Sequence, residues 1–332
     1  MSRTEDASPM IFAFVPRDGT LERLTLEPGE PLPEHTVWID LVAPTVQEDR
    51  MVEQYLGIAV PTREEMQEIE VSSRLYLENG ARYMTATLMC QSETATPITT
   101  PVTFILSGHR LATVRYDDPR PFAIVVNKLG RACPPKVTGD NVVMDLLDAV
   151  IDRSADILER IGAEIDQISH TIFEPEPDAG PPSYNDVLKA LGRKGDLTSK
   201  VRESLVSIGR LLLFLANEAE TMKWAKDARM QVQSMQRDVV SLTDHASYIS
   251  NKVTFLLDAM LGVVNIQQNA IIKIFSVAAV VLMPPTLVAS IYGMNFKHMP
   301  ELDFEYGYPM AIAVMVLAAV LPYMWFKWKK WL

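Results

Sequence analysis

Residues Ile274–Phe296 read IFSVAAVVLMPPTLVASIYGMNF, an uncharged stretch between Lys273 and Lys297 that decides the fold class. Its 23 residues can cross the ~30 Å hydrocarbon core of a bilayer as a helix rising ~1.5 Å per residue. A second uncharged stretch of 21 residues, Tyr306–Phe326, lies between Glu305 and Lys327. The sequence therefore predicts two membrane spans, both near its C-terminal end.

The flanks of these spans predict how the chain crosses the membrane. Basic residues collect on the cytoplasmic side and Trp at the interface. Both kinds occur where the second span ends, because Lys327, Lys329 and Lys330 are interleaved with Trp325, Trp328 and Trp331. The loop between the spans is acidic, with Glu301, Asp303 and Glu305. We expect a bacterial-type inner membrane protein with both termini in the cytoplasm.

The rest of the chain reads as soluble protein, and its charge and motifs exclude several functions. The net charge of −11 argues against nucleic acid as a partner and suits divalent cations. Cys90 and Cys133 have neither metal-ligand nor redox spacing. The sequence contains no phosphate-binding Gly-Lys loop and no nucleophile elbow, so we do not expect an enzyme.

Residues 1–140 predict a cytoplasmic α/β domain, because short apolar runs there are broken by turn formers. Helices are expected over Thr45–Leu56 and Arg63–Ile69. The expected strands are Met10–Val15, Thr36–Leu41, Arg82–Cys90, Val102–Leu106 and Arg110–Tyr116.

From Val142 the apolar residues recur with the period of a helix. Residues 141–217 predict a helical hairpin that turns near Phe173 and ends near Ala216. A stalk helix over residues 218–292 then continues into the first span, followed by an outer loop (293–305) and the second span with its basic tail (306–332).

A heptad seam runs along the stalk and the first span. Its members are small or polar, apart from two, whereas a seam that packs helices together in water is apolar. Small and hydroxyl residues also join ordinary membrane helices. A pore explains more, because the same face continues below the membrane with polar side chains. The seam comprises Asp258, Gly262, Asn265, Asn269, Ile272, Ser276, Ala279, Met283, Thr286, Ser290 and Gly293. Since two spans cannot enclose a lumen, a pore requires several copies of the chain.

The end of the first span resembles the CorA family of Mg²⁺ channels. The motif is Tyr292-Gly293-Met294-Asn295-Phe296, with Met299-Pro300-Glu301 a few residues on. Met283-Pro284-Pro285-Thr286 and the Gly-Tyr-Pro that opens the second span also fit the family. The resemblance is specific over about residues 250–332 and weaker over Glu70–Thr85.

The resemblance implies a funnel-shaped homopentamer whose first span lines an Mg²⁺ pore, with entry of Co²⁺ or Ni²⁺ also plausible. It places the ion filter at Tyr292, Gly293, Met294 and Asn295, puts Glu301 in the outer loop, and brings Phe275 near a hydrophobic constriction. A ring of neutral oxygens suits a hydrated ion, because Mg²⁺ gives up its water reluctantly.

Family members are commonly closed by intracellular Mg²⁺ that acidic residues bind between subunits. Carboxylates spaced by three and four residues share one helix face and repel each other unless they are neutralised. The candidates here are Asp145, Asp148, Asp152 and Asp156 on the first long helix, and Asp238 or Asp244 on the stalk. A solvated charged face is the alternative interpretation of these residues.

Two other functions stay open at this point. One is a Zn²⁺ transporter of the same superfamily, against which Met299-Pro300-Glu301 argues. The other is a membrane-anchored sensor or scaffold, in which the spans only tether the α/β domain.

Overall fold

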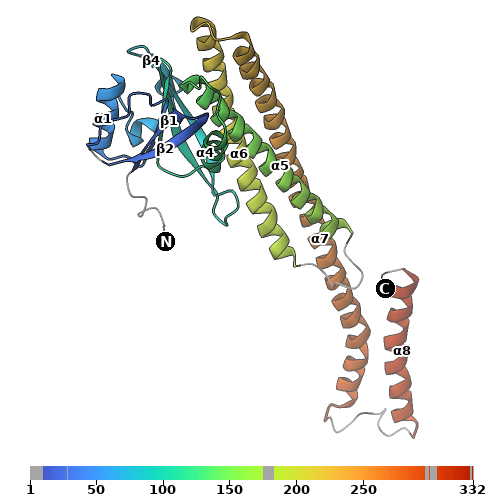
Figure 1. The fold of residues 1–332 in the computed structure, drawn as a ribbon. Helices are drawn as coiled ribbons and strands as arrows, with labels where there is room; N and C mark the ends of the chain where they lie inside the picture. The colour runs from blue at the N-terminus through green and yellow to red at the C-terminus, as the bar shows by residue number, and fades with distance from the viewer. Residues whose placement is uncertain are drawn as a thin grey trace. The chain divides into compact units, whose positions relative to one another are not determined.

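The computed structural model describes residues 10–27, 29–174, 183–295, 299, 305–329 and 331. The chain divides into two compact units, Met1–Leu256 and Leu257–Leu332. The first unit contains a sheet, six helices and the beginning of a seventh (Figure 1). The second unit contains the rest of that helix and one more. This order of elements confirms the predicted α/β domain followed by long helices and two C-terminal apolar helices.

The first unit is built on a seven-stranded sheet with the order β2-β1-β3-β7-β6-β5-β4. Neighbours are antiparallel except β3 and β7, which are parallel. The strands are β1 (Met10–Arg17), β2 (Thr20–Leu26), β3 (Trp38–Val42), β4 (Leu75–Glu78), β5 (Ala81–Cys90), β6 (Ile98–Ser107) and β7 (Arg110–Arg115). The sequence predicted the five inner strands and missed β2 and β4. Both are edge strands with few buried residues, so their apolar pattern is weak.

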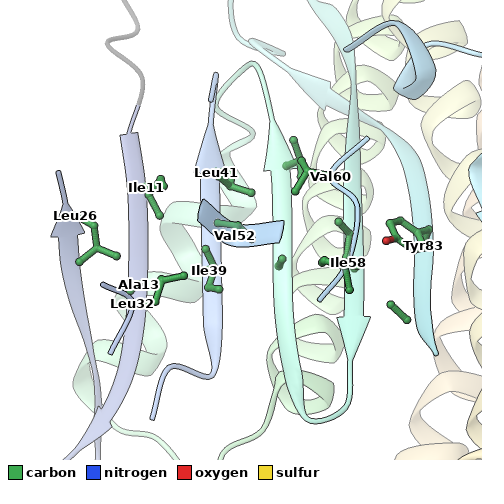
Figure 2. Packing of buried hydrophobic residues seen from close by; sticks show 14 of the residues in the cluster. Ile11, Ala13, Leu26, Leu32, Ile39, Leu41, Val52, Ile58, Val60 and Tyr83 are labelled. Carbon is green, nitrogen blue, oxygen red and sulfur yellow. The ribbon is translucent and has the colours of Figure 1, made fainter. Parts of the chain in front are cut away.

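One face of the sheet packs against a layer of short helices (Figure 2). Alternate strand residues such as Ile11, Ile39 and Leu41 meet Val52 of α1 in one buried cluster. The helices are α1 (Val46–Leu56), α2 (Arg63–Met66) and α3 (Val71–Arg74). The expected helix Arg63–Ile69 is thus shorter than predicted and is followed by a separate turn of helix.

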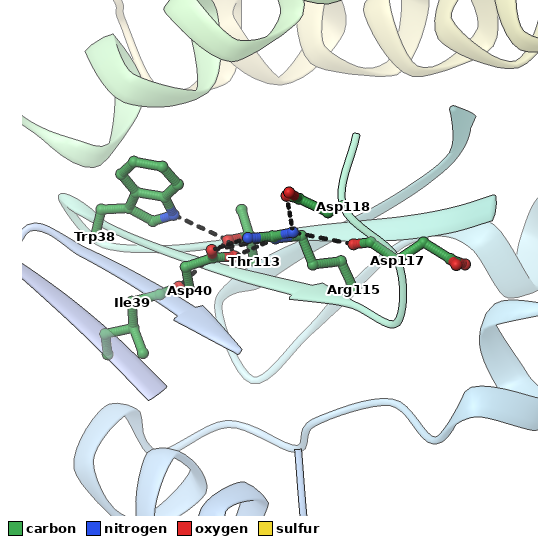
Figure 3. A network of polar contacts seen from close by, with 7 residues as sticks. All are labelled: Trp38, Ile39, Asp40, Thr113, Arg115, Asp117 and Asp118. Atoms are coloured by element: carbon green, nitrogen blue, oxygen red, sulfur yellow. Dashed lines mark hydrogen bonds and ion pairs between the residues drawn. The ribbon is translucent and has the colours of Figure 1, made fainter. Parts of the chain in front are cut away.

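The other face of the sheet carries a buried polar network beneath the longer helices (Figure 3). Trp38 Nε1 donates to Thr113 Oγ1 at 2.9 Å, and Thr113 Oγ1 donates to Asp40 Oδ1 at 2.7 Å. Arg115 Nη2 lies 2.9 Å from Asp40 Oδ2 and Nη1 lies 2.7 Å from Asp118 Oδ1. The covering helices are α4 (Arg120–Arg131), α5 (Gly139–Phe173) and α6 (Tyr184–Thr221).

Helix α7 (Lys226–Tyr292) has 67 residues and runs from the first unit into the second, including Pro284 and Pro285. The hairpin and stalk were predicted to meet near residues 216–218, whereas α6 ends at Thr221 and α7 begins at Lys226. This reversal contains neither Gly nor Pro. Lys223 instead adopts a left-handed backbone, with φ of 53°, so no Gly or Pro marks the exact position of the turn. Helix α8 (Gly307–Trp328) completes the second unit.

Candidate ion pathway and acidic cluster

Helices α7 and α8 are long and apolar enough to cross a membrane. Only 6% of the most apolar window of each helix is buried. Core helices of soluble proteins are mostly buried, so these two helices need an apolar environment that the chain itself does not supply. Lys273 Nζ lies 5.9 Å from the ring centre of Trp331. This contact brings the start of the first span beside the tail that follows the second, as two antiparallel spans require.

The predicted seam lies on a free face of α7. All of its residues from Asp258 to Ser290 are exposed in the single chain, as is Phe275. Within residues 261–292, all described, Val277 is the one buried side chain of α7. At roughly 100° per residue, the seam points on average roughly 130° away from Val277. The seam is therefore distinct from the side of the span that the chain covers.

Thr286 shows how the seam can offer oxygen atoms. Its hydroxyl donates to the backbone oxygen of Leu282, four residues earlier, at 2.7 Å. The hydroxyl hydrogen is thus engaged in a hydrogen bond within the helix, and the lone pairs of the exposed Thr286 oxygen remain available as acceptors. Such an oxygen accepts hydrogen bonds from water, including the water around a cation.

The residues predicted to form the filter lie at the carboxyl end of α7 and just after it. Gly293 N donates to Ala289 O at 2.9 Å and Met294 N donates to Ile291 O at 3.2 Å, while Asn295 is exposed. A Cβ atom on Gly293 would approach Ala289 O to 3.0 Å, a tight contact that a larger residue must relieve by a local shift. The carbonyl end of a helix has a partial negative charge that favours cations. Glu301 and Asp303 lie outside the described residues.

Four of the predicted sensor residues come together in the first unit. Burial raises the pKa of Asp148, the carboxylates of Asp152, Asp145 and Asp238 raise it further, and Lys128 opposes them. Residues from α5 and α7 therefore share one acidic cluster, which we define as Asp145, Asp148, Asp152 and Asp238.

Lys128 is the residue of this cluster that the sequence analysis missed. Its Nζ lies 2.8 Å from Asp145 Oδ1, and this hydrogen bond, with the charges of Asp148 and Asp152, raises the pKa of Lys128. Lys128 belongs to α4, and no motif connects it with α5. Its role depends on the packing of two helices, which periodicity does not reveal.

The cluster does not form a complete metal site in one chain. Among the residues that the structure describes, no three His, Cys, Asp or Glu side chains are grouped to hold a metal ion. Asp156 and Asp244 are exposed. Cys90 is buried, and burial raises the pKa of its thiol to about 12, so it is no thiolate ligand at neutral pH.

Comparisons with known proteins agree on one family. Residues 33–329 match the family model described as CorA-like Mg²⁺ transporter protein. The magnesium transport protein CorA of Escherichia coli (strain K12) is 36% identical over 325 residues, covering 97% of this chain and 100% of the relative. The protein of that name from Mannheimia succiniciproducens is 34% identical over 323 residues, with coverage of 97% and 100%.

A solved structure shares the fold. The complete structure of the CorA magnesium transporter from Methanocaldococcus jannaschii matches with a TM-score of 0.74. The match covers 98% of this chain and 99% of that one at 17% identity. At this identity the likeness concerns the fold alone.

Proposed function

The chain belongs to the family of CorA-like Mg²⁺ transporter proteins, and from this premise we propose that it carries Mg²⁺ across a membrane through a pore formed by several copies of α7. It is a membrane transport protein and not an enzyme. The exposed seam of α7 is the observation that carries the proposal. In an otherwise apolar span it offers small and hydroxyl side chains that the chain leaves uncovered, as a water-filled pathway requires.

The oligomer is proposed to be a homopentamer. The two helices of one chain cannot surround a lumen, whereas copies of the seam arranged around an axis would line one. Going outward, the path would pass Asp258, Asn265 and Asn269, then Ile272, Ser276 and Ala279, then Met283, Thr286 and Ser290. Phe275, 72% exposed beside the seam, would narrow the pore toward its inner end.

The filter is proposed at the mouth, where Tyr292, Gly293, Met294 and Asn295 follow one another. The Asn295 amide oxygen and the carbonyl oxygens at the end of α7 are neutral, so they accept hydrogen bonds from the waters that Mg²⁺ keeps. A ring of carboxylates would hold a divalent ion more strongly and slow its release. Glu301 in the outer loop would raise the local concentration of cations. The same neutral filter would also pass Co²⁺ or Ni²⁺.

The proposed orientation places both termini in the cytoplasm and the 293–305 loop outside the inner membrane. The support is the charge of the flanks. Lys327, Lys329 and Lys330 follow the second span, and the contact of Lys273 with Trp331 places the other basic flank beside them.

Closure by intracellular Mg²⁺ is proposed at Asp148, Asp152 and Asp238. The charges of Asp152 and Asp238 raise the pKa of Asp148, and the charges of Asp148 and Asp152 raise that of Lys128. The three carboxylates thus gather negative charge that one lysine only partly neutralises. Because one chain does not group three metal ligands among its described residues, further ligands would come from a second copy. Asp244 lies exposed on the same helix and would be such a ligand.

Flux through the purified full chain in liposomes tests the pore. We expect Mg²⁺ entry that Asn295→Ala lowers at least about tenfold, while Asn185→Ala, at an exposed position of α6, leaves it unchanged. The same assay with Zn²⁺, Co²⁺ and Ni²⁺ ranks the ions. If Asn295→Ala did not change Mg²⁺ flux, the pore proposal would be wrong, and α7 and α8 would only anchor the α/β domain in the membrane.

The sensor has its own test. In current recordings, Asp148→Asn should shift inhibition to higher cytoplasmic Mg²⁺, because the cluster loses one of its charges. Asp186→Asn, at an exposed site on α6, should not. Unchanged inhibition in Asp148→Asn removes that residue from the sensor and leaves the pore proposal intact.

A further inference from the structure

The first unit contains a cavity of about 470 Å³ whose lining residues have a net positive charge, although the chain as a whole is negative. One side of α6 forms most of its wall, and α3, β5 and a residue of α7 complete it. Three guanidinium groups line it, those of Arg74, Arg202 and Arg210, against the single carboxylate of Glu203. The lining thus has a net charge of +2 in a chain whose net charge is −11. We call this cavity the arginine pocket.

Arg74, at the end of α3, is held in place by hydrogen bonds within the fold. Its Nη1 donates to Thr87 Oγ1 at 3.0 Å and its Nε donates to Glu68 O at 2.6 Å. The Thr87 backbone N–H in turn donates to Ser207 Oγ at 2.9 Å, which ties β5 to α6. Burial lowers the pKa of Arg74; Glu203 acts against this change and Arg210 adds to it. The positive charge of Arg74 is therefore fixed by the fold and only partly balanced.

Arg202 and Arg210 add charge from one face of α6. They are eight residues apart, with Val206 midway, so all three side chains leave the same side of the helix. Within the described part of the chain, neither guanidinium forms an ion pair or a hydrogen bond to another side chain. Both have all their donors available to a ligand or to water.

We infer that the arginine pocket binds a small phosphate-bearing molecule of nucleoside monophosphate size, whose phosphoryl oxygens contact Arg74, Arg202 and Arg210. The planar fork of Arg matches the oxygens of a phosphoryl group and pairs with it in a bidentate way. The volume falls within the usual range for small-molecule sites, about 300–1,000 Å³. It exceeds the size of inorganic phosphate, and the exposed apolar side chains of Ile69 and Val206 (88% and 37% exposed) offer contact to the rest of the ligand.

Calorimetric titration of the full chain in detergent tests the inference, with AMP and pyrophosphate as probes in Mg²⁺-free buffer containing EDTA. We expect one saturable site per chain. Arg202→Ala and Arg210→Ala should each weaken binding of AMP by about tenfold, through loss of a charge-assisted contact. Arg193→Ala, an exposed arginine of α6 outside the pocket, should not change it. Glu203→Gln should tighten binding, because it removes the one opposing charge.

Three results would overturn the inference: no saturable binding of either probe, equal weakening by Arg193→Ala, or no tightening by Glu203→Gln. A fourth concerns a second copy of the chain. If Arg202→Glu dissociates the oligomer and neither probe binds the unmodified protein, the pocket receives a carboxylate from a neighbouring copy instead. Binding is measured without Mg²⁺ flux, so these outcomes are independent of the proposed pore.

Discussion

The two units of this chain differ in how far their side chains are buried and paired within one chain. In the first unit, the sheet is covered on both faces, and even the charged pair of Asp40 and Arg115 is buried and hydrogen bonded. In the second unit, only 6% of the most apolar window of α7 and of α8 is buried, and the seam residues from Asp258 to Ser290 are exposed. One chain covers the core of the first unit, whereas the proposed function has lipid and further copies cover the second.

This difference separates stability from function. Substitutions of buried, hydrogen-bonded groups in the first unit are expected to change the free energy of unfolding, because each one leaves a fixed partner unpaired. Substitutions on the seam should instead change flux with little effect on folding, because the seam residues from Asp258 to Ser290 are exposed in the single chain. Each of the following predictions tests one side of this separation.

The largest expected effect on stability is that of Asp40→Ala. It leaves the guanidinium of Arg115, whose side chain is only 8% exposed, with a buried charge and without its main partner. Removal of one member of a buried pair costs about 3–5 kcal/mol. Thermal or denaturant unfolding of the detergent-solubilised protein measures the loss.

Asp118→Ala is the matched control, since Asp118 contacts the same guanidinium through a side chain that is 77% exposed. An exposed ion pair contributes less than about 1 kcal/mol. Equal losses from the two variants would contradict the view that burial makes the Asp40–Arg115 pair important.

On the other side of the comparison, two neighbouring alanines of α7 form a test pair. Ala279 lies on the seam, and Ala278 points roughly 100° away from it around the helix; both are exposed. Ala279→Phe should lower Mg²⁺ flux by at least about tenfold, because a bulky apolar ring expels water from a narrow pore. Ala278→Phe should leave flux near its original value.

Both alanine variants should unfold at the temperature of the unmodified protein, which separates a blocked pore from a misfolded one. If Ala278→Phe blocks flux and Ala279→Phe does not, the pore is lined by a different face of α7. That result would retain the family and refute the proposed pathway.

The parts of the fold that depend on local pattern were predictable from the sequence. The two spans follow from an absence of charge over 23 and 21 residues, and the long helices follow from their apolar period. The seam was found in the same way, by its spacing. Its lining role and the filter at Gly293 and Asn295 stay predictions, since they concern several copies of the chain.

The parts that depend on contacts between distant segments were not predictable. Edge strands β2 and β4 have a weak apolar pattern of their own and are defined by their pairing with β1 and β5. Lys128 reaches the acidic cluster only because α4 packs on α5. The arginine pocket likewise brings Arg74, the last residue of α3, together with a face of α6 that lies more than a hundred residues later in the sequence. Nothing in local spacing relates these residues.

The smallest predicted effect concerns Asp49, one of four described residues of the first unit that have a buried polar side-chain atom without a hydrogen-bond partner. Asp49 Oδ1 is buried without a hydrogen-bond partner. Burial, followed by the charges of Glu53 and Glu48, raises the pKa of this carboxyl from 3.8 to about 6. Between these pH values the folded state binds more protons than the unfolded state, so the free energy of unfolding falls as pH rises through this window.

Asp49→Asn should remove this pH dependence and stabilise the protein at pH 7 by about 1–2 kcal/mol, after allowance for solvent screening at a half-buried site. Unfolding measured from pH 4 to pH 7 gives both quantities, and Glu34→Gln, at an exposed carboxylate, is the control. The stabilised variant should keep its Mg²⁺ flux, since Asp49 lies in α1. If flux fell with the gain in stability, the two units would be coupled, and the separation between a self-sufficient domain and a pore made by several copies would fail.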